Sequence, residues 1–174
     1  RDPDFDPIAA RVTINRWIAG EVARTRDTVT QAIEEHRYND AAGALYGFAW
    51  NVFCDWYVEL IKPLLSGNDA AAKAETQHCA QWVLDQILVL LHPFMPFVTE
   101  ELWQKTGAQG MLIDAQWPSY QGLGDAKVDA EMSWVVDFIS EVRSVRAEMN
   151  ADAALLGTGR RTGIDLVASR VDEA

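Results

Sequence analysis

Hydrophobic and polar positions alternate along most of this chain with the period of an α-helix. In the stretch from Tyr38 to Pro63, two sets of apolar residues recur at gaps of three or four, from Leu45 to Leu60 and from Trp50 to Ile61. Between them, polar residues repeat with the same period: Asn51, Asp55, Glu59 and Lys62. A helix that is apolar over most of its circumference is surrounded by other helices. The pattern therefore predicts the central helix of a bundle.

Capping residues and prolines predict where this central helix begins and ends. Asn39 or Asp40 can cap its N-terminus by accepting hydrogen bonds from the free N–H groups of the first turn. Pro63 is expected to end the helix, because the proline ring pushes the preceding residue out of the helical region.

The same period predicts three further long helices, over residues of about 7–35, 69–92 and 125–149, and a short one over 96–107. Asp6 and Asp69 can cap two of them, and Pro93 and Pro96 separate the third long helix from the short one. The last helix is expected to bury one face along its whole length: Val128, Met132, Val135, Ile139, Val142 and Met149. Short connections force antiparallel neighbours, so the predicted fold class is an all-α antiparallel bundle.

Residues 1–150 are predicted to form this helical domain, and residues 151–174 an irregular, loosely held tail. Residues 107–124 have no helical period and predict an irregular connection with a short extended piece around Met111 to Ile113. Within the tail, Ile164 to Val167 is one possible short strand. The chain begins without Met and in the middle of a pattern, which indicates a piece of a longer protein.

Composition limits the classes of function. The 174 residues include 26 acidic and 15 basic ones, giving a formal net charge of −11. Nucleic-acid-binding domains usually carry a basic patch, so any contact with RNA would need a local cluster of Arg and Lys. A cytoplasmic protein is expected, because no secretory signal and no membrane-length apolar run is visible.

No catalytic or metal-binding constellation is visible in the sequence. His36, His78 and His92 lie far apart and lack metal-ligand spacing. Cys54 and Cys79 are expected to be small buried residues. Asp55 and Glu59 could act as an acid–base pair, but a polar stripe between helices is the preferred interpretation.

Three segments resemble the anticodon-binding domain of the class I aminoacyl-tRNA synthetases. They are NRWI at 15–18, YNDAAGALYGFAWNVFCDWYVELIKP at 38–63 and HPFMPFVTEELW at 92–103. Within that class, WNVFCDWYVELIKP and the later segment VRSVRAEMN at 142–150 are most similar to the valyl-tRNA synthetases. The resemblance covers residues of about 5–150, and it departs from the family after Asn150.

The resemblance implies a domain that binds the anticodon stem and loop of a valine-accepting tRNA and catalyses nothing itself. The whole enzyme would use ATP, and its catalytic domain, whose signatures are absent here, would charge the tRNA. This chain would need no cofactor or metal, and no membrane or DNA partner is expected. Binding would combine phosphate contacts from cations with stacking of splayed bases.

Seven cations within the matched region are candidates for contacts with tRNA: Arg16, Arg24, Arg37, Lys62, Lys105, Arg143 and Arg146. Arg143 and Arg146 lie three residues apart and share a helix face, although a salt bridge to a neighbouring helix is an equal alternative. Five residues of the family motif are expected to orient helices: Asn51, Asp55, Trp56, Tyr57 and Glu59.

Two alternatives stay open at this point. The same domain could belong to an isoleucyl- or leucyl-tRNA synthetase. A helical scaffold without an RNA role is also consistent with the acidic charge.

Overall fold

The computed structural model describes residues 5–155, and their side chains as far as residue 149. Over this range the regular structure is entirely helical, so the predicted all-α class is confirmed. Two compact units are distinguished, Arg1–Met132 and Ser133–Ala174. The possible strand at 164–167 lies outside the described residues, and the boundary near residue 150 stays a prediction.

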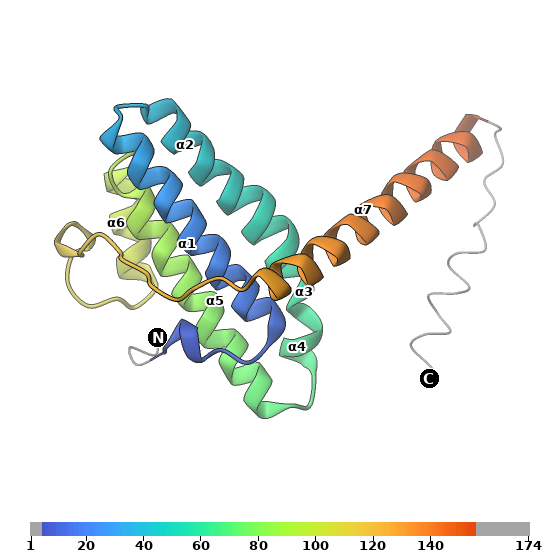
Figure 1. Cartoon of the computed structure of the whole chain (residues 1–174), viewed down its shortest axis with the longest axis horizontal. Helices are drawn as coiled ribbons and strands as arrows, with labels where there is room; N and C mark the ends of the chain where they lie inside the picture. Colours follow the sequence, from blue (N-terminus) through green and yellow to red (C-terminus); the bar gives the residue numbers. More distant parts are fainter. Residues whose placement is uncertain (1–4, 156–174) are drawn as a thin grey trace. The chain divides into compact units, whose positions relative to one another are not determined.

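The first unit is built around three long helical stretches that lie side by side (Figure 1). These are α1 (Thr13–Glu34), α2 (Tyr38–Tyr46) with its continuation, and α5 (Ala70–Leu91). The continuation comprises a π-helical segment (Gly47–Tyr57), α3 (Val58–Leu60) and α4 (Lys62–Ser66). The remaining elements are α6 (Pro96–Lys105), α7 (Ala126–Leu155) and two 3₁₀ turns, Pro7–Ala9 and Leu112–Asp114.

Of the three predicted caps, only Asp69 stands at the start of the helix for which it was predicted. Asp69 accepts hydrogen bonds from the N–H groups of Ala71 and Ala72 at 3.0 Å and begins α5. Asp6 accepts from Ile8 at 3.0 Å, but it caps only a 3₁₀ turn, so α1 begins later than predicted, at Thr13. At α2 the predicted side-chain cap is absent, because Arg37 occupies the capping position without a side-chain bond.

Pro63 does not end the central helical stretch, contrary to the prediction. A turn at Ile61 interrupts the helix instead, and Pro63 lies in the first turn of α4. A proline is tolerated there because the N–H that it lacks would have no intrahelical partner.

The π-helical segment changes which residues of the central stretch face the core. Phe48 and Tyr57 are buried and Trp56 is half-buried, as the pattern predicts. Trp50, however, is 57% exposed. A π-helix bonds residues five apart instead of four, so side chains that would share a face in an α-helix move around the axis. Cys54 lies in the same π-helical segment and is exposed, so the prediction that it is buried is wrong.

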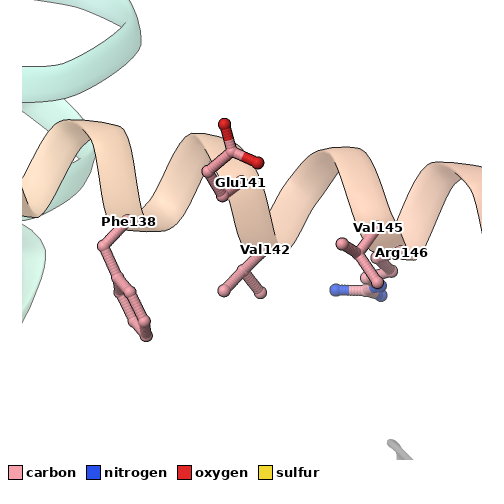
Figure 2. A pocket seen from close by; sticks show the side chains of 5 residues that line it. All are labelled: Phe138, Glu141, Val142, Val145 and Arg146. Carbon is pink, nitrogen blue, oxygen red and sulfur yellow. The ribbon is translucent and has the colours of Figure 1, made fainter.

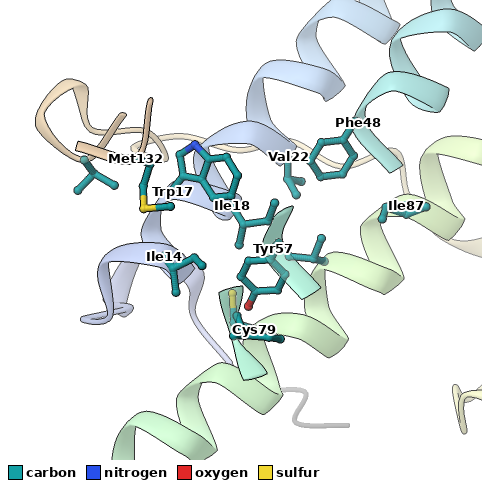
Figure 3. Packing of buried hydrophobic residues seen from close by; sticks show 12 residues of the cluster. Ile14, Trp17, Ile18, Val22, Phe48, Tyr57, Cys79, Ile87 and Met132 are labelled. Atoms are coloured by element: carbon teal, nitrogen blue, oxygen red, sulfur yellow. The ribbon is translucent and has the colours of Figure 1, made fainter. Parts of the chain in front are cut away.

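The main core joins α1, the π-helical segment and α5 with the beginning of α7. Figure 3 shows Ile18, Val22 and Tyr57 packed together between these helices. A second cluster joins Val29 and Leu90 with the start of α2. Interiors of this kind are the main source of folding free energy.

Only the beginning of α7 is buried. Val128 and Met132 belong to the core of the first unit, at 4% and 6% exposure. Val142 and Met149 are 51% and 45% exposed, so the predicted burial along the whole helix is wrong for its second half. Helical spacing defines a face, but only packing decides whether a neighbour covers it.

The connection between α6 and α7 is irregular, as predicted. The extended piece is limited to Met111, because Leu112–Asp114 forms a 3₁₀ turn. Both carboxylate oxygens of Glu100 accept from the N–H of Leu112 at 3.0 Å, and this fixes the turn against α6.

Candidate nucleic-acid interface

Two of the sequence motifs that carry the family resemblance meet in a buried polar network. The Tyr57 hydroxyl donates to the Asn15 side-chain oxygen at 2.9 Å. The Asn15 amide nitrogen donates to Glu75 at 3.0 Å and to Thr76 at 3.1 Å. Asn15, Tyr57 and Thr76 are each 0% exposed. The amide thereby uses its acceptor and both donors, and it ties α1, the π-helical segment and α5 together.

The protonation states of this network follow from its surroundings. Burial raises the pKa of the Tyr57 hydroxyl far above its usual range, so the group is always a neutral donor. Burial also raises the pKa of the Cys79 thiol to about 12. Burial opposes ionisation of Glu75, but hydrogen bonds from Asn15 and from two backbone N–H groups prevail and hold its pKa below the usual range.

The third motif, HPFMPFVTEELW, shapes the turn between α5 and α6. Thr99 is buried at 1% exposure, and its hydroxyl donates to the Met95 carbonyl at 2.8 Å. The His92 ring nitrogen Nδ1 lies 2.9 Å from the same hydroxyl. His92 therefore packs in this turn, as the sequence indicates.

Two of the seven candidate cations are brought together on α1. Arg16 forms an ion pair with Asp125, and Arg24 pairs with Glu21 and Asp129, each at 2.7 Å. Asp125 also accepts from the N–H of Lys127 at the beginning of α7. These pairs join α1 to the beginning of α7 within the first unit.

Three other candidates form local pairs on separate helices. Arg37 pairs with Glu35 and Asp40. Lys62 pairs with Glu59 at 2.6 Å, and Lys105 pairs with Glu101 at 2.7 Å. Exposed pairs of this kind contribute little to stability and are screened by salt, so a phosphate group can compete for the cation.

The remaining two candidates lie on the second half of α7. Arg143 has an interaction partner. Arg146 has no ion-pair or hydrogen-bond partner within the described part of the chain, and it borders an apolar surface depression of about 270 Å³ (Figure 2). Phe138, Val142 and Val145 project to one side of the helix there. Within the first unit, the five candidates thus lie in separate ion pairs, and the other two candidates belong to the second unit.

The family-motif residues divide into buried and exposed sets. Tyr57 is buried and Trp56 packs against the core, and their role in orienting helices stays a prediction. Asn51, Asp55 and Glu59 are exposed, and Glu59 pairs with Lys62. The expected polar stripe between helices is therefore a solvent-facing stripe.

Two aromatic contacts of the connection with α1 were missed from the sequence. The Arg26 guanidinium lies 5.3 Å from the centre of the Tyr120 ring and donates to the Tyr120 carbonyl at 3.2 Å. The Trp117 indole N–H donates to the Thr30 hydroxyl at 2.9 Å. In the sequence, the only signal for these contacts is that Arg26 and Thr30 lie one helical turn apart on α1. That signal is weak, because nothing in the sequence indicates that Tyr120 and Trp117 are their partners.

Trp117 also borders a surface pocket of about 320 Å³ on the first unit. Its walls come from the end of α1, the turn after α5 and the connection that follows α6: Thr30, Ile33, Glu34, Pro93 and Trp117. Pockets of this size hold small ligands or single aromatic groups.

The described residues contain no group of three or more His, Cys, Asp or Glu side chains placed to hold a metal ion. Among the same residues, no helix combines the length and apolar character needed to cross a membrane.

The family model described as the anticodon-binding domain of tRNA ligase matches residues 15–156. The match begins within α1 and extends through the described part of α7, and the chain belongs to this family.

The individual relatives have a more specific name. A protein of Rhizobium meliloti named valine–tRNA ligase is 54% identical over 157 residues, which is 87% of this chain and 16% of that protein. Proteins of the same name from Caulobacter vibrioides and Agrobacterium fabrum are 50% and 49% identical. They match 95% of this chain and 20% and 18% of their own lengths. The chain thus spans a fifth or less of these relatives.

Proposed function

We propose that this chain is the part of a valine–tRNA ligase that binds the anticodon stem and loop of a valine-accepting tRNA. The main support for this proposal is the family match over residues 15–156. Relatives of about 50% identity are named valine–tRNA ligases. The relatives' names favour valine over isoleucine or leucine as the amino acid.

In this proposal the domain contributes positioning. A catalytic domain of the same polypeptide would use ATP to join valine to the tRNA in the cytoplasm. Holding the anticodon hairpin in a fixed orientation turns the approach of the acceptor end into an intramolecular step. The stiffness needed for this has support in the Asn15 network, which joins three helices by buried hydrogen bonds.

The seven cations would bind phosphate groups, and the five with printed ion pairs, on the first unit, would exchange their carboxylate partners for phosphate. Lys62 and Lys105 have side chains 62% and 68% exposed, so their ammonium groups are accessible. Because the formal net charge is −11, acidic surface repels RNA outside the contact region, and we expect weak, salt-sensitive binding by the isolated domain.

Filter binding of labelled tRNA to the 174-residue chain tests the proposal across a series of salt concentrations. The logarithm of the binding constant should fall linearly with the logarithm of salt concentration. Replacing Arg143 and Arg146 by Gln should reduce the slope by about one for each phosphate contact removed. Lys73→Gln, a cation outside the seven, is the matched control.

Valine tRNA should also bind better than DNA of the same length. Binding that does not change with salt, or that is equal for tRNA and DNA, would contradict the proposal. A slope unchanged by the Arg143 and Arg146 replacements, with valine tRNA still preferred, would assign the phosphate contacts to the other cations.

A further inference from the structure

The second half of α7 carries a regular apolar seam. Five exposed or half-buried residues recur there at alternating gaps of three and four: Val135, Phe138, Val142, Val145 and Met149. From Phe138 onward, each of them is between 45% and 57% exposed, so no helix in the described part of the chain covers the seam. In a heptad written a to g, these five residues occupy the a and d positions, which face the partner helix of a coiled coil.

The surface depression on this half of α7 matches the hole of a coiled coil. Its volume is about 270 Å³, and it is lined by Phe138, Glu141, Val142, Val145 and Arg146. In a parallel pair of helices, a side chain at position a inserts between four residues of the facing helix, at positions d, g, a and the next d. The first four lining residues occupy these positions in that order, and Figure 2 shows the three apolar ones on one side of the helix. The depression therefore fits Val142 of a second copy.

The charges that flank the seam are also self-complementary. Glu141 is at position g, and Arg146 is at the e position five residues later. In a parallel pair, each g position meets that e position of the facing helix, so two copies form a Glu141–Arg146 contact on both sides of the seam. Within the described part of the chain, neither side chain has an ion-pair partner already. An antiparallel pair matches g with g and e with e, and gives no such contact.

We infer that two copies of this chain associate in parallel through the seam of α7 from Val135 to Met149. The seam spans two heptads, whereas stable coiled coils sustain the pattern over at least about three or four. Each copy has a formal charge of −11, although residues 133–149 contribute little of it, with three acidic and two basic side chains. Association is therefore weak and reversible, with a dissociation constant on the order of 100 µM.

Sedimentation equilibrium of the 174-residue chain tests this between about 10 µM and about 1 mM, a range that brackets the expected dissociation constant. The average mass should rise with concentration from that of one chain toward that of two. Val142→Asp should abolish the rise, because it places a charge where the seam would be buried. Ser140→Asp is the matched control, because it adds the same charge at an exposed position on the other side of the helix. Circular dichroism shows whether each variant is folded.

Exchanging the flanking charges tests the parallel orientation. Glu141→Arg brings arginines together and Arg146→Glu brings acids together, so each variant alone should associate about 3- to 10-fold more weakly. An equimolar mixture of the two variants restores opposite charges and should associate at least as well as the unaltered chain. In a Cys54→Ser background, which removes the exposed thiol, Val145→Cys should form a disulfide-linked dimer on oxidation, and Ser140→Cys should not.

A mass that stays that of one chain up to about 1 mM would overturn the inference, and the seam would then be a face for a different protein or for another part of a longer polypeptide. Association that Val142→Asp leaves unchanged would also overturn it, because the copies would then meet through another surface. The same holds if the mixed charge variants associate no better than each alone, or if Val145→Cys does not cross-link. The outcome is independent of the proposed function, which the tRNA salt titration tests separately.

Discussion

Replacing Tyr57 by Phe removes one hydroxyl from the centre of the bundle and leaves the ring in place. The lost hydrogen bond is the one to the Asn15 side-chain oxygen at 2.9 Å. Because Asn15 is 0% exposed, water cannot replace the missing donor. A buried acceptor left without a partner costs about 1–3 kcal/mol. We expect Tyr57→Phe to lower the free energy of unfolding by that amount.

Urea unfolding followed by circular dichroism measures the effect. The midpoint should fall while the m-value stays constant, since the surface exposed on unfolding hardly changes. The melting temperature should fall by about 2–4 °C for each kcal/mol in a chain of this length. Tyr46→Phe is the matched control, because Tyr46 is 66% exposed, and it should change stability by less than about 0.5 kcal/mol.

A double-mutant cycle with Asn15→Ala isolates the interaction between the two side chains. In the Tyr57→Phe background, the Asn15 replacement should cost less than in the unaltered chain, with a coupling of about 0.5–3 kcal/mol. If the two effects add within about 0.3 kcal/mol, or if Tyr57→Phe is as harmless as Tyr46→Phe, the buried network does not hold the helices together.

Three further outcomes follow from the structure. Glu75 has a depressed pKa in the folded chain, so its stabilising effect is complete above its unfolded pKa and is lost as pH falls through the folded pKa. The stability difference between the unaltered chain and Glu75→Gln should therefore shrink on acidification, and a difference that grows would contradict this. Glu100→Ala removes the acceptor for the Leu112 N–H, so hydrogen exchange at that amide should become faster. Arg24→Gln breaks the partly exposed pair with Asp129 and should lower the free energy of unfolding, measured in urea, by less than about 1 kcal/mol.

Features of the fold that depend on neighbouring residues, such as helical class, helix caps and proline breaks, could be predicted from the sequence. Helical period gave the all-α class, and Asp69 was identified correctly as the cap of α5. Asp6 does cap a helical turn, but it is the 3₁₀ turn before α1 and not the long helix. Pro93 and Pro96 correctly separate α5 from α6. Caps and prolines act on backbone groups within one helical turn, so their effects can be read from neighbouring residues.

The candidate interface was less predictable. The seven cations could be named, but their ion pairs with partners such as Asp125 and Asp129 could not, since those partners lie more than 100 residues away from Arg16 and Arg24. The pocket at Trp117 was also missed, because its walls come from three segments that only packing brings together.

The sequence by itself determined that the chain is helical, where most helices begin, and which family its motifs resemble. The tertiary structure alone decided that Asn15 meets Tyr57 across 42 residues. It also decided that Trp50 faces outward and that α7 buries only its beginning. The physical reason is that a periodic pattern specifies which side chains share a face. The arrangement of all the helices together decides which neighbour covers that face. It also decides which buried polar groups become hydrogen-bond partners.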